Sequence, residues 1–319
     1  MSVDQDVTKG DFVLRQLRDV YGARIVQEMS LASMTTFKVG GVADLFFETS
    51  VPEEVIRVTE MLADVDWPIT VFGGGSNVVV SSRGIRGLVI RMRRGKICMA
   101  RPGVVRVDAG VSINELVRWT IVRGLGGLSK WAGTPGTVGG ALHGNAHFQG
   151  DLIGDKVVSV GIVNQQGRAF DVGVTQMRFG YDTSRLKEEM ECALWAEFAV
   201  YEDGPQTLRN IARESVAYRK ETQPLSARSA GCVFQNPDQE SDSLPHGSAA
   251  SAGALIEKAG LKNLSVGGAR VSTLHGNFIV ANDAVSSEDI RTLIETCRTV
   301  VHERFGITLR EEIVYLGEF

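Results

Sequence analysis

Two glycine-rich segments carry the residues best suited to bind an anion. The first is Gly73-Gly74-Gly75-Ser76-Asn77, which follows a short apolar run, and the second spans residues 133–141. Glycine lets the backbone reach positive φ and approach a ligand closely, so consecutive amides can converge on phosphate oxygens. The residue pattern therefore predicts that these segments hold a phosphate-bearing molecule.

Neither segment fits a common nucleotide motif. Val78 occupies the third glycine position of G-x-G-x-x-G, and the first segment lacks the lysine of a P-loop. Taken alone, the glycine triplet is equally compatible with a tight turn between strands that contains bulges. The second segment is too long and too rich in small residues for a simple turn, so the two together favour a large phosphate-bearing cofactor.

Six segments in a fixed order add specificity, and one of them reads Ala-Gly-Cys-Val-Phe-Gln-Asn-Pro. They are residues 35–41, 73–77, 133–146, 218–224, 230–237 and 309–317. In this order the chain resembles the UDP-N-acetylenolpyruvoylglucosamine reductase family over nearly its whole length, in the compact form without an inserted subdomain. The resemblance implies an α+β fold with two FAD-binding subdomains of the vanillyl-alcohol-oxidase type and a C-terminal substrate domain.

The resemblance also implies an activity. Such an enzyme uses FAD, with NADPH as hydride donor, to reduce UDP-N-acetylglucosamine enolpyruvate to UDP-N-acetylmuramate in peptidoglycan precursor synthesis, and so serves cell-wall biogenesis, cell shape and cell division. The cofactor carries the hydride chemistry. The protein must stabilise an enolate-like charge beside the substrate carboxylate and supply a proton to the neighbouring carbon.

The binding residues follow from matching positions. The cofactor residues implied are Thr36, Gly73, Gly74, Gly75, Ser76, Asn77, Gly133, Thr134, Gly136, Gly139, Gly140 and Asn145. The substrate residues implied are Tyr218, Arg219, Lys220, Gln223 and Asn236. Cations suit this second set because two phosphates must be neutralised. For Lys220 the alternative is a basic helix end that interacts with the helix dipole.

Two catalytic residues are implied in the C-terminal part. Cys232 stands where the family has a proton-donating serine, and a thiol is a stronger acid than a hydroxyl. Its alternative is a small buried hydrophobic residue. In the last strand Glu311 and Glu312 face opposite sides, and the register favours Glu312 as the second catalytic group, leaving Glu311 as a solvated edge charge.

The third catalytic position departs from the family pattern. Asp182 follows Tyr181 where an arginine is expected, and an aspartate about 4 Å from the substrate carboxylate costs about 4 kcal/mol at an effective dielectric of about 20. Either Asp182 turns away and Arg185 supplies the positive charge, or the protein is an FAD-binding nucleotide-sugar sensor with weak or no catalysis. A second departure is His147, where the family has glycine.

Composition limits the remaining classes. A net charge of −4 and a pI near 5.8 argue against a nucleic-acid partner, and no apolar run is long enough to span a bilayer. The four scattered cysteines suggest neither a metal site nor a disulfide framework, and the first residues lack the apolar stretch of a secretory signal. We expect a soluble cytoplasmic protein with no membrane partner and no obligate protein partner.

The elements that must position these residues alternate between strand and helix. We expect domains at 1–94, 95–203 and 204–319, the first two binding FAD and the third binding substrate. Helices are expected from Val13 to Gly22, after a capping box at residues 50–53, after the Ser112 cap, at 206–220 and at 287–305. Strands are expected at 36–49 (an edge strand broken by Gly40-Gly41), 69–72, 78–80, 88–90, 96–109, 157–163, 193–200 and 312–316, and a mobile loop at 238–251.

Overall fold

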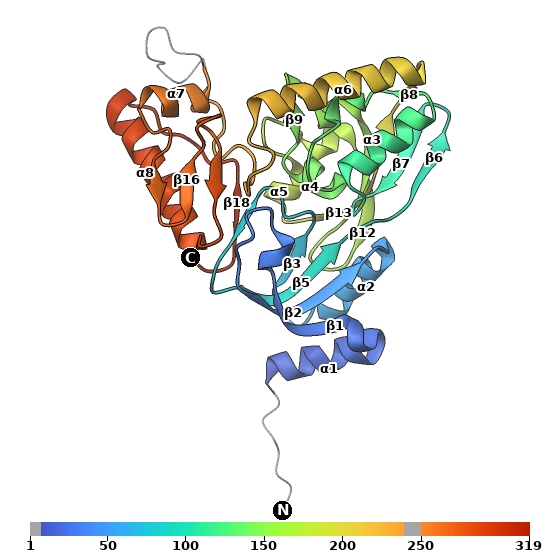
Figure 1. Cartoon of the computed structure of the whole chain (residues 1–319). Coiled ribbons are helices and arrows are strands. Elements are labelled where there is room, and N and C mark those ends of the chain that lie inside the picture. Colours follow the sequence, from blue (N-terminus) through green and yellow to red (C-terminus); the bar gives the residue numbers. More distant parts are fainter. Residues whose placement is uncertain (1–7, 239–249) are drawn as a thin grey trace, which may run out of the picture. The chain divides into compact units, whose positions relative to one another are not determined.

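A computed structural model describes residues 8–238 and 250–319 of the chain, and it has the expected α+β character (Figure 1). The α-helices are α1 (Lys9–Tyr21), α2 (Pro52–Leu62), α3 (Ile113–Val122), α4 (Val138–His143), α5 (Arg185–Glu188), α6 (Pro205–Thr222), α7 (Ala252–Lys258) and α8 (Ser287–Phe305). The strands of the first half are β1 (Ile25–Ser30), β2 (Val42–Thr49), β3 (Ile69–Phe72), β4 (Val78–Val80), β5 (Ile85–Met92), β6 (Ile97–Arg101), β7 (Val104–Asp108), β8 (Leu125–Gly126), β9 (His147–Phe148) and β10 (Asp151–Leu152). Those of the second half are β11 (Val157–Val163), β12 (Ala169–Gly173), β13 (Cys192–Ala199), β14 (Tyr201–Glu202), β15 (Ser265–Val266), β16 (Ala269–Val271), β17 (Ile279–Ala281) and β18 (Val314–Leu316).

The described chain divides into two compact units. The first unit contains residues 8–29, Ala43–Gly73 and Arg86–Arg209. The second unit contains Ser30–Val42, Gly74–Ile85, and residues 210–238 and 250–319. The predicted division into three domains stays a prediction. The predicted mobile loop falls mainly on residues 239–249, which lie outside the described residues.

The first unit opens with α1 and the sheet ordered β1-β2-β5-β3. Helix α1 ends as expected at Gly22, whose φ of 58° suits glycine. The expected edge strand over residues 36–49, broken at Gly40-Gly41, is confirmed only after the break, where β2 begins at Val42. The expected edge position is wrong, because β2 lies between β1 and β5. The chain before it cannot continue as a strand, since Lys38 and Gly40 have positive φ.

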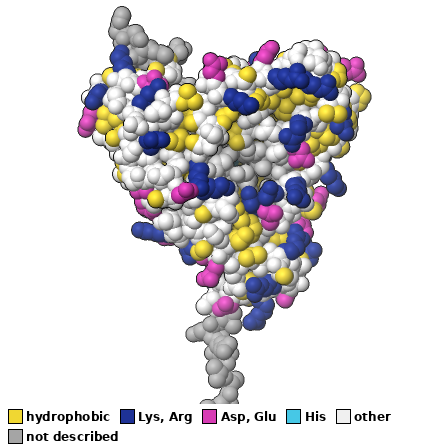
Figure 2. Space-filling model, viewed as in Figure 1, with side chains coloured by type: hydrophobic (Ala, Val, Ile, Leu, Met, Phe, Trp, Pro, Cys, Tyr) yellow, Lys and Arg dark blue, Asp and Glu magenta, His cyan; other side chains and the backbone are white. Residues whose placement is uncertain are grey.

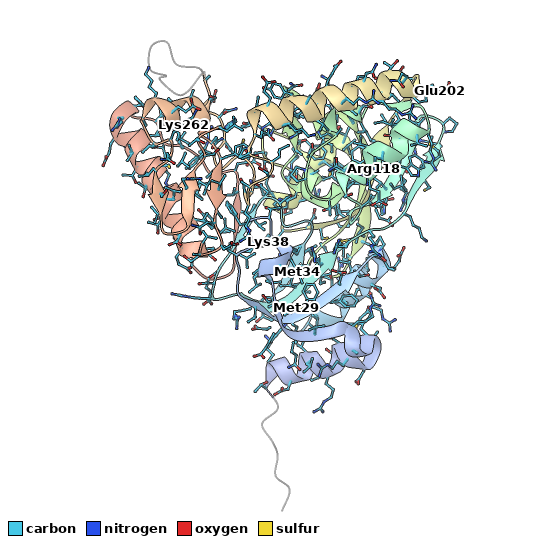
Figure 3. All side chains as sticks on the ribbon, in the orientation of Figure 1. Met29, Met34, Lys38, Arg118, Glu202 and Lys262 are labelled. Atoms are coloured by element: carbon cyan, nitrogen blue, oxygen red, sulfur yellow. The ribbon has the colours of Figure 1, made fainter. Side chains whose placement is uncertain are left out.

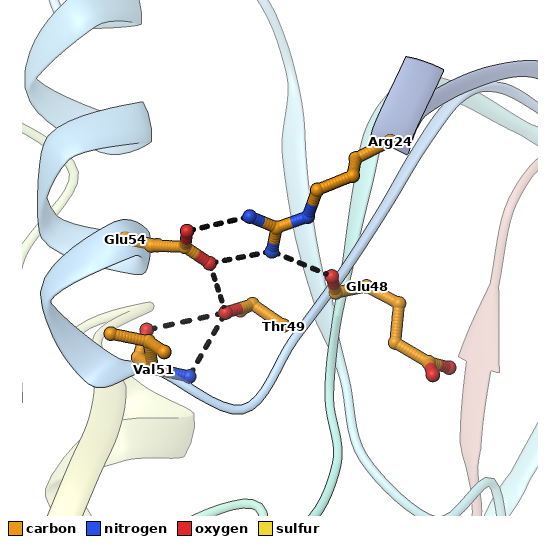
Figure 4. A network of polar contacts seen from close by, with 5 residues as sticks. All are labelled: Arg24, Glu48, Thr49, Val51 and Glu54. Atoms are coloured by element: carbon orange, nitrogen blue, oxygen red, sulfur yellow. Dashed lines mark hydrogen bonds and ion pairs between the residues drawn. The ribbon is translucent and has the colours of Figure 1, made fainter. Parts of the chain in front are cut away.

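A polar network joins β2 to the start of α2 (Figure 4). Arg24 donates to both carboxylate oxygens of Glu54 at 2.7 Å, and the Thr49 hydroxyl accepts from the N–H of Val51 at 2.9 Å. The Arg24 hydrogen bond lowers the pKa of Glu54. The expected capping box is wrong because Val51 is the N-cap residue and makes no side-chain cap, while Pro52 at the first helical position is as expected.

A second sheet of the first unit is ordered β12-β11-β13-β7-β6 and is antiparallel throughout. Gly161 on β11 is required by close packing, since a Cβ there would lie 2.1 Å from Nε1 of Trp195 on β13. Helix α3 begins at the expected Ser112 cap, whose hydroxyl accepts from the N–H of Glu115. Ser112, at the start of α3, forms an antiparallel bridge with Thr137 in the second glycine-rich segment.

The second unit packs α7 and α8 around the sheet ordered β15-β16-β17 and pairs β4 with β18 in parallel. Helix α8 has the predicted bounds, with a capping box from Ser286 and Asp289 and a left-handed Gly306 at its end. Strand β18 begins two residues later than expected. Residues 310–312 instead pair with residues 233–235, which brings two predicted catalytic segments together.

The surface carries mixed charge on the face that Figure 2 draws, where basic and acidic side chains are interspersed. Within residues 8–238 and 250–319, no helix is both long and apolar enough to cross a bilayer.

Candidate active site

The first glycine-rich segment of the second unit is tied to the last strand. Thr36 donates its backbone N–H to the Gly75 carbonyl at 3.0 Å, and Gly75 adopts a φ of 64°. Asn77 donates from Nδ2 to the Glu312 carbonyl at 3.1 Å and accepts from the N–H of Val314 at 3.0 Å. A predicted cofactor residue therefore contacts the backbone of the predicted catalytic Glu312, just before β18.

Cys232 lies on a segment that runs between two other segments of the same chain. On one side Cys232 pairs with Phe278, and on the other the N–H of Glu312 donates to the Val233 carbonyl at 2.8 Å. Gly231, with a φ of 84°, turns the backbone into this segment. The pairing places Cys232 and Glu312 on adjacent segments of the chain, as the predicted catalytic pair requires.

Burial keeps the Cys232 thiol protonated at neutral pH. Burial is the largest cause that raises the pKa of Cys232, and the nearby Glu312 carboxylate raises it further, while Arg219 and the Asn277 side chain act in the opposite direction. Arg219 is itself only 6% exposed, and burial lowers its pKa to about 10, so it remains a cation at neutral pH. Cys232 is therefore a partly exposed acid whose pKa responds to both a carboxylate and a guanidinium.

The two glutamates of the last strand have different surroundings. Glu311 accepts from Nη1 of Arg298 at 2.7 Å and its side chain is 18% exposed. The expectation of a solvated edge charge is therefore wrong for Glu311. The side chain of Glu312 instead acts on the Cys232 thiol, which favours Glu312 as the catalytic candidate.

The predicted substrate residues are spread along the end of α6 and beyond. Tyr218 and Lys220 are exposed, and Arg219 between them is buried toward Cys232. The N–H of Gln223 donates to the Arg219 carbonyl at 2.9 Å. Oδ1 of the Asn236 side chain accepts from the N–H of Ala252 at 3.1 Å and so helps to fix the start of α7.

The second glycine-rich segment, in the first unit, is shaped from within. Asn114 accepts from the N–H of Gly133 at 2.7 Å and donates to the Thr134 carbonyl at 2.9 Å. Gly139 donates its N–H to Ala109 at 2.9 Å, and Gly140 donates to the Thr137 hydroxyl at 3.3 Å. Gly133, Gly139 and Gly140 thus use their amides to build the loop, which sequence reasoning did not anticipate.

Close packing within the protein explains the glycines at Gly73 and Gly139. A Cβ on Gly73 would lie 2.6 Å from the Thr137 hydroxyl oxygen, and one on Gly139 would lie 3.1 Å from Cβ of Ala109. Gly136 has a φ of 97°, which suits glycine.

Asn145 plays a structural part. Its side chain is fully buried, accepts from the N–H of Gly154 at 2.9 Å and donates to the Gly180 carbonyl at 2.7 Å. The oxygen and the nitrogen of the Asn145 side-chain amide both bond to backbone groups. These bonds favour a role for Asn145 in holding the segment that ends at Tyr181. The ring of Tyr181 lies 4.9 Å from the ring of His147, the other residue that departs from the family pattern.

Asp182 is buried and adopts a left-handed φ of 54°. Its carboxylate lies 3.2 Å from Nζ of Lys187, and the same Nζ donates to the Asp182 carbonyl at 3.0 Å. Arg185 forms two hydrogen bonds to Glu191, at 2.7 and 2.9 Å, which neutralise its charge. Lys187 rather than Arg185 is therefore the cation beside Asp182.

Sequence reasoning missed three residues that hold the candidate site together. They are Asn114, Lys187 and Asn277. Lys187 lies five positions after Asp182, close enough for a local pattern to suggest the pair. Asn277 contacts Phe234 across 43 positions of sequence, and no local signal in a single sequence reports such a contact.

Comparison with known proteins places these features in context. The segment 43–173 matches the family model "FAD binding domain", and 223–316 matches "UDP-N-acetylenolpyruvoylglucosamine reductase, C-terminal domain". These matches confirm the predicted α+β class with an FAD-binding part followed by a C-terminal domain.

Relatives with known names match over almost the full chain. The UDP-N-acetylenolpyruvoylglucosamine reductase of Bacillus subtilis is 34% identical over 96% of this chain and 98% of that protein. That of Synechococcus elongatus is 35% identical over 92% of this chain and 95% of the relative. The crystal structure of the Thermus caldophilus enzyme superimposes with a TM-score of 0.76 at 29% identity, covering 92% of this chain and 99% of that one.

Proposed function

The chain belongs to the UDP-N-acetylenolpyruvoylglucosamine reductase family, and from that premise we propose which of its residues perform the reaction. It is an FAD-containing oxidoreductase that reduces UDP-N-acetylglucosamine enolpyruvate to UDP-N-acetylmuramate, with NADPH as the reductant, for peptidoglycan synthesis. Bound FAD supplies the hydride transfer from NADPH to the vinyl carbon of the substrate.

The observation that carries the residue assignment is the cluster of Cys232, Glu312 and Arg219 beside the segment that Thr36 and Asn77 hold. Reduction adds a hydride to one vinyl carbon and a proton to the carbon beside the carboxylate. Cys232 gives that proton from Sγ, since its raised pKa keeps the thiol protonated until negative charge develops next to it.

Glu312 and Arg219 have complementary roles in this assignment. Glu312 relays a proton from solvent to the thiolate that Cys232 leaves behind: the carboxylate accepts the proton, passes it to Sγ and is again ionised. Arg219 stabilises the thiolate while the proton is absent, because a buried guanidinium at this position lowers the cost of a nearby negative charge. The same guanidinium also suits the anionic substrate.

We propose the same binding residues that the sequence predicts, and their contacts separate those that shape the backbone from the others. We assign FAD binding to Thr36 and to the glycine-rich segments 73–77 and 133–140, where Gly133, Gly139 and Gly140 shape the backbone and Asn145 supports it. Tyr218, Arg219, Lys220, Gln223 and Asn236 are assigned to the UDP-sugar. We place the reaction in the cytoplasm.

Asp182 is compatible with catalysis because Lys187 balances its charge. An ion pair presents a much weaker field to a substrate carboxylate than an isolated aspartate does, so the repulsion calculated for a lone carboxylate does not apply. This pairing removes the electrostatic reason for a non-catalytic sensor. Arg185, engaged by Glu191, has no substitute role in our assignment.

The experiment separates the two half-reactions of the purified yellow holoenzyme. In Cys232→Ala we expect NADPH to reduce the flavin at the rate of the parent protein, and reduced enzyme to convert substrate at least about 100-fold more slowly. Cys98→Ala, which removes an exposed thiol, is the matched control and keeps both rates. Equal loss of both half-reactions, or loss of neither, rejects Cys232 as the proton donor.

A further inference from the structure

Asn277 contacts the backbone of the two residues that follow Cys232. It is 3% exposed, its Oδ1 accepts from the N–H of Phe234 at 2.9 Å, and its Nδ2 donates to the Phe234 carbonyl at 2.7 Å. Its own carbonyl accepts from the N–H of Val233 at 2.9 Å. One residue therefore holds three backbone groups directly after Cys232.

The Asn277 side chain also affects the thiol. Burial is the main cause that raises the pKa of Cys232, and Asn277 acts in the opposite direction. Its two side-chain bonds to Phe234 use the oxygen and the nitrogen of the amide, which leaves a single orientation for the amide.

A turn that precedes Asn277 fixes its position. The Ser272 hydroxyl accepts from the N–H of Leu274 at 3.1 Å, and Nδ1 of His275 accepts from the N–H of Asn277 at 3.2 Å. Glu257, which pairs with Lys262 (labelled in Figure 3), accepts from the N–H of Gly276 at 3.4 Å. This turn is built independently of Cys232, so it acts as a rigid base for the Asn277 amide.

We propose that Asn277 is a positioning residue for proton delivery: its side-chain amide and its carbonyl hold the backbone of Phe234 and Val233, and this hold directs the Cys232 thiol for transfer to substrate. This inference rests on the proposed role of Cys232.

The test is a double-mutant cycle on the conversion of substrate by the reduced holoenzyme. Asn277→Ala is expected to slow this half-reaction about 10-fold to 100-fold when Cys232 is present, the size expected when two buried backbone groups lose their hydrogen bonds, with flavin reduction by NADPH kept. In the Cys232→Ala background the same substitution is expected to change the rate by no more than about 2-fold, because nothing remains to be positioned.

Ser272→Ala is the control for loss of the turn alone. It removes an acceptor of two turn N–H groups without touching Cys232, and we expect a lower unfolding midpoint with the ratio of the two half-reactions retained. Should Asn277→Ala fail to fold, Asn277→Asp carries the same cycle, since it keeps the acceptor for Phe234 N–H and removes the N–H donor.

The outcomes distinguish this inference from the proposed function. If Cys232→Ala leaves substrate conversion unchanged, the proton-donor assignment fails and takes the role of Asn277 with it. If Cys232→Ala slows conversion but the effect of Asn277→Ala is equally large in both backgrounds, only the positioning role is overturned. A loss in Ser272→Ala that matches the loss in Asn277→Ala also overturns it.

Discussion

At the scale of single residues, Asp182 lies where the family resemblance implies an arginine, and its buried carboxylate forms an ion pair with Lys187. The two side chains differ in exposure, 4% for Asp182 and 33% for Lys187. Removing the lysine therefore leaves a buried carboxylate whose charge must be compensated in another way. A pair of this kind is more costly to break than to replace as a whole.

We expect Lys187→Met to lower the free energy of unfolding by about 1–3 kcal/mol, the cost of removing the ammonium group that forms an ion pair with the buried Asp182 carboxylate. Adding Asp182→Asn is expected to restore most of this loss, because the charge that needed a partner is gone. Urea denaturation of the holoenzyme measures both. The control is Arg178→Met, whose pairs with Glu188 and Glu189 are about half exposed and contribute less than about 1 kcal/mol. Equal losses for Lys187→Met and Arg178→Met would contradict the analysis.

At the scale of elements, the two glycine-rich segments are held by side chains rather than by regular pairing. Asn114 and Thr137 fix the second segment, and Thr36 and Asn77 fix the first. Loops of this kind have few regular hydrogen bonds of their own, so the polar side chains decide their shape. A Cβ added to Gly73 would lie 2.6 Å from the Thr137 hydroxyl oxygen, so the first unit leaves little room for a side chain at this position.

Gly73→Ala is expected to lower stability by about 1–3 kcal/mol, because its Cβ would lie 2.6 Å from the Thr137 hydroxyl oxygen. Thr137→Ala loses a helix cap and is expected to cost about 1 kcal/mol. The double variant should cost less than the two changes added together, since the clash disappears with the hydroxyl. Thermal unfolding and FAD retention report the cycle. Strictly additive costs would show that the close approach does not limit the packing.

At the scale of the whole molecule, local patterns predict some elements and miss others for a physical reason. The bounds of α8 and the caps of α1 and α3 depend on nearby residues, and the sequence predicts them correctly. The pairing of β4 with β18 joins segments from opposite ends of the chain, and the late start of β18 follows from a non-local contact. The candidate site has the same character. Cys232 and Glu312 are recognisable by motif, whereas the Asn277 contact depends on the folded chain.

Each unit also carries a histidine that folding keeps neutral, His143 in the first and His275 in the second. Burial lowers the pKa of both below the usual 6.5, and Lys187 adds to the effect at His143. The unfolded chain therefore binds more protons than the folded one as pH falls below 6.5, and the free energy of unfolding decreases in acid. At His275 protonation also removes the Nδ1 acceptor that receives the N–H of Asn277.

We expect the urea midpoint of the holoenzyme to fall between pH 7.5 and pH 5.5, with each histidine contributing at most about 1.4 kcal/mol per pH unit. His143→Gln and His275→Gln should each flatten this slope, because glutamine does not titrate, and the double variant should be flattest. A parent protein whose midpoint is constant over this range, or variants that keep its slope, would show that neither histidine is held neutral by the fold.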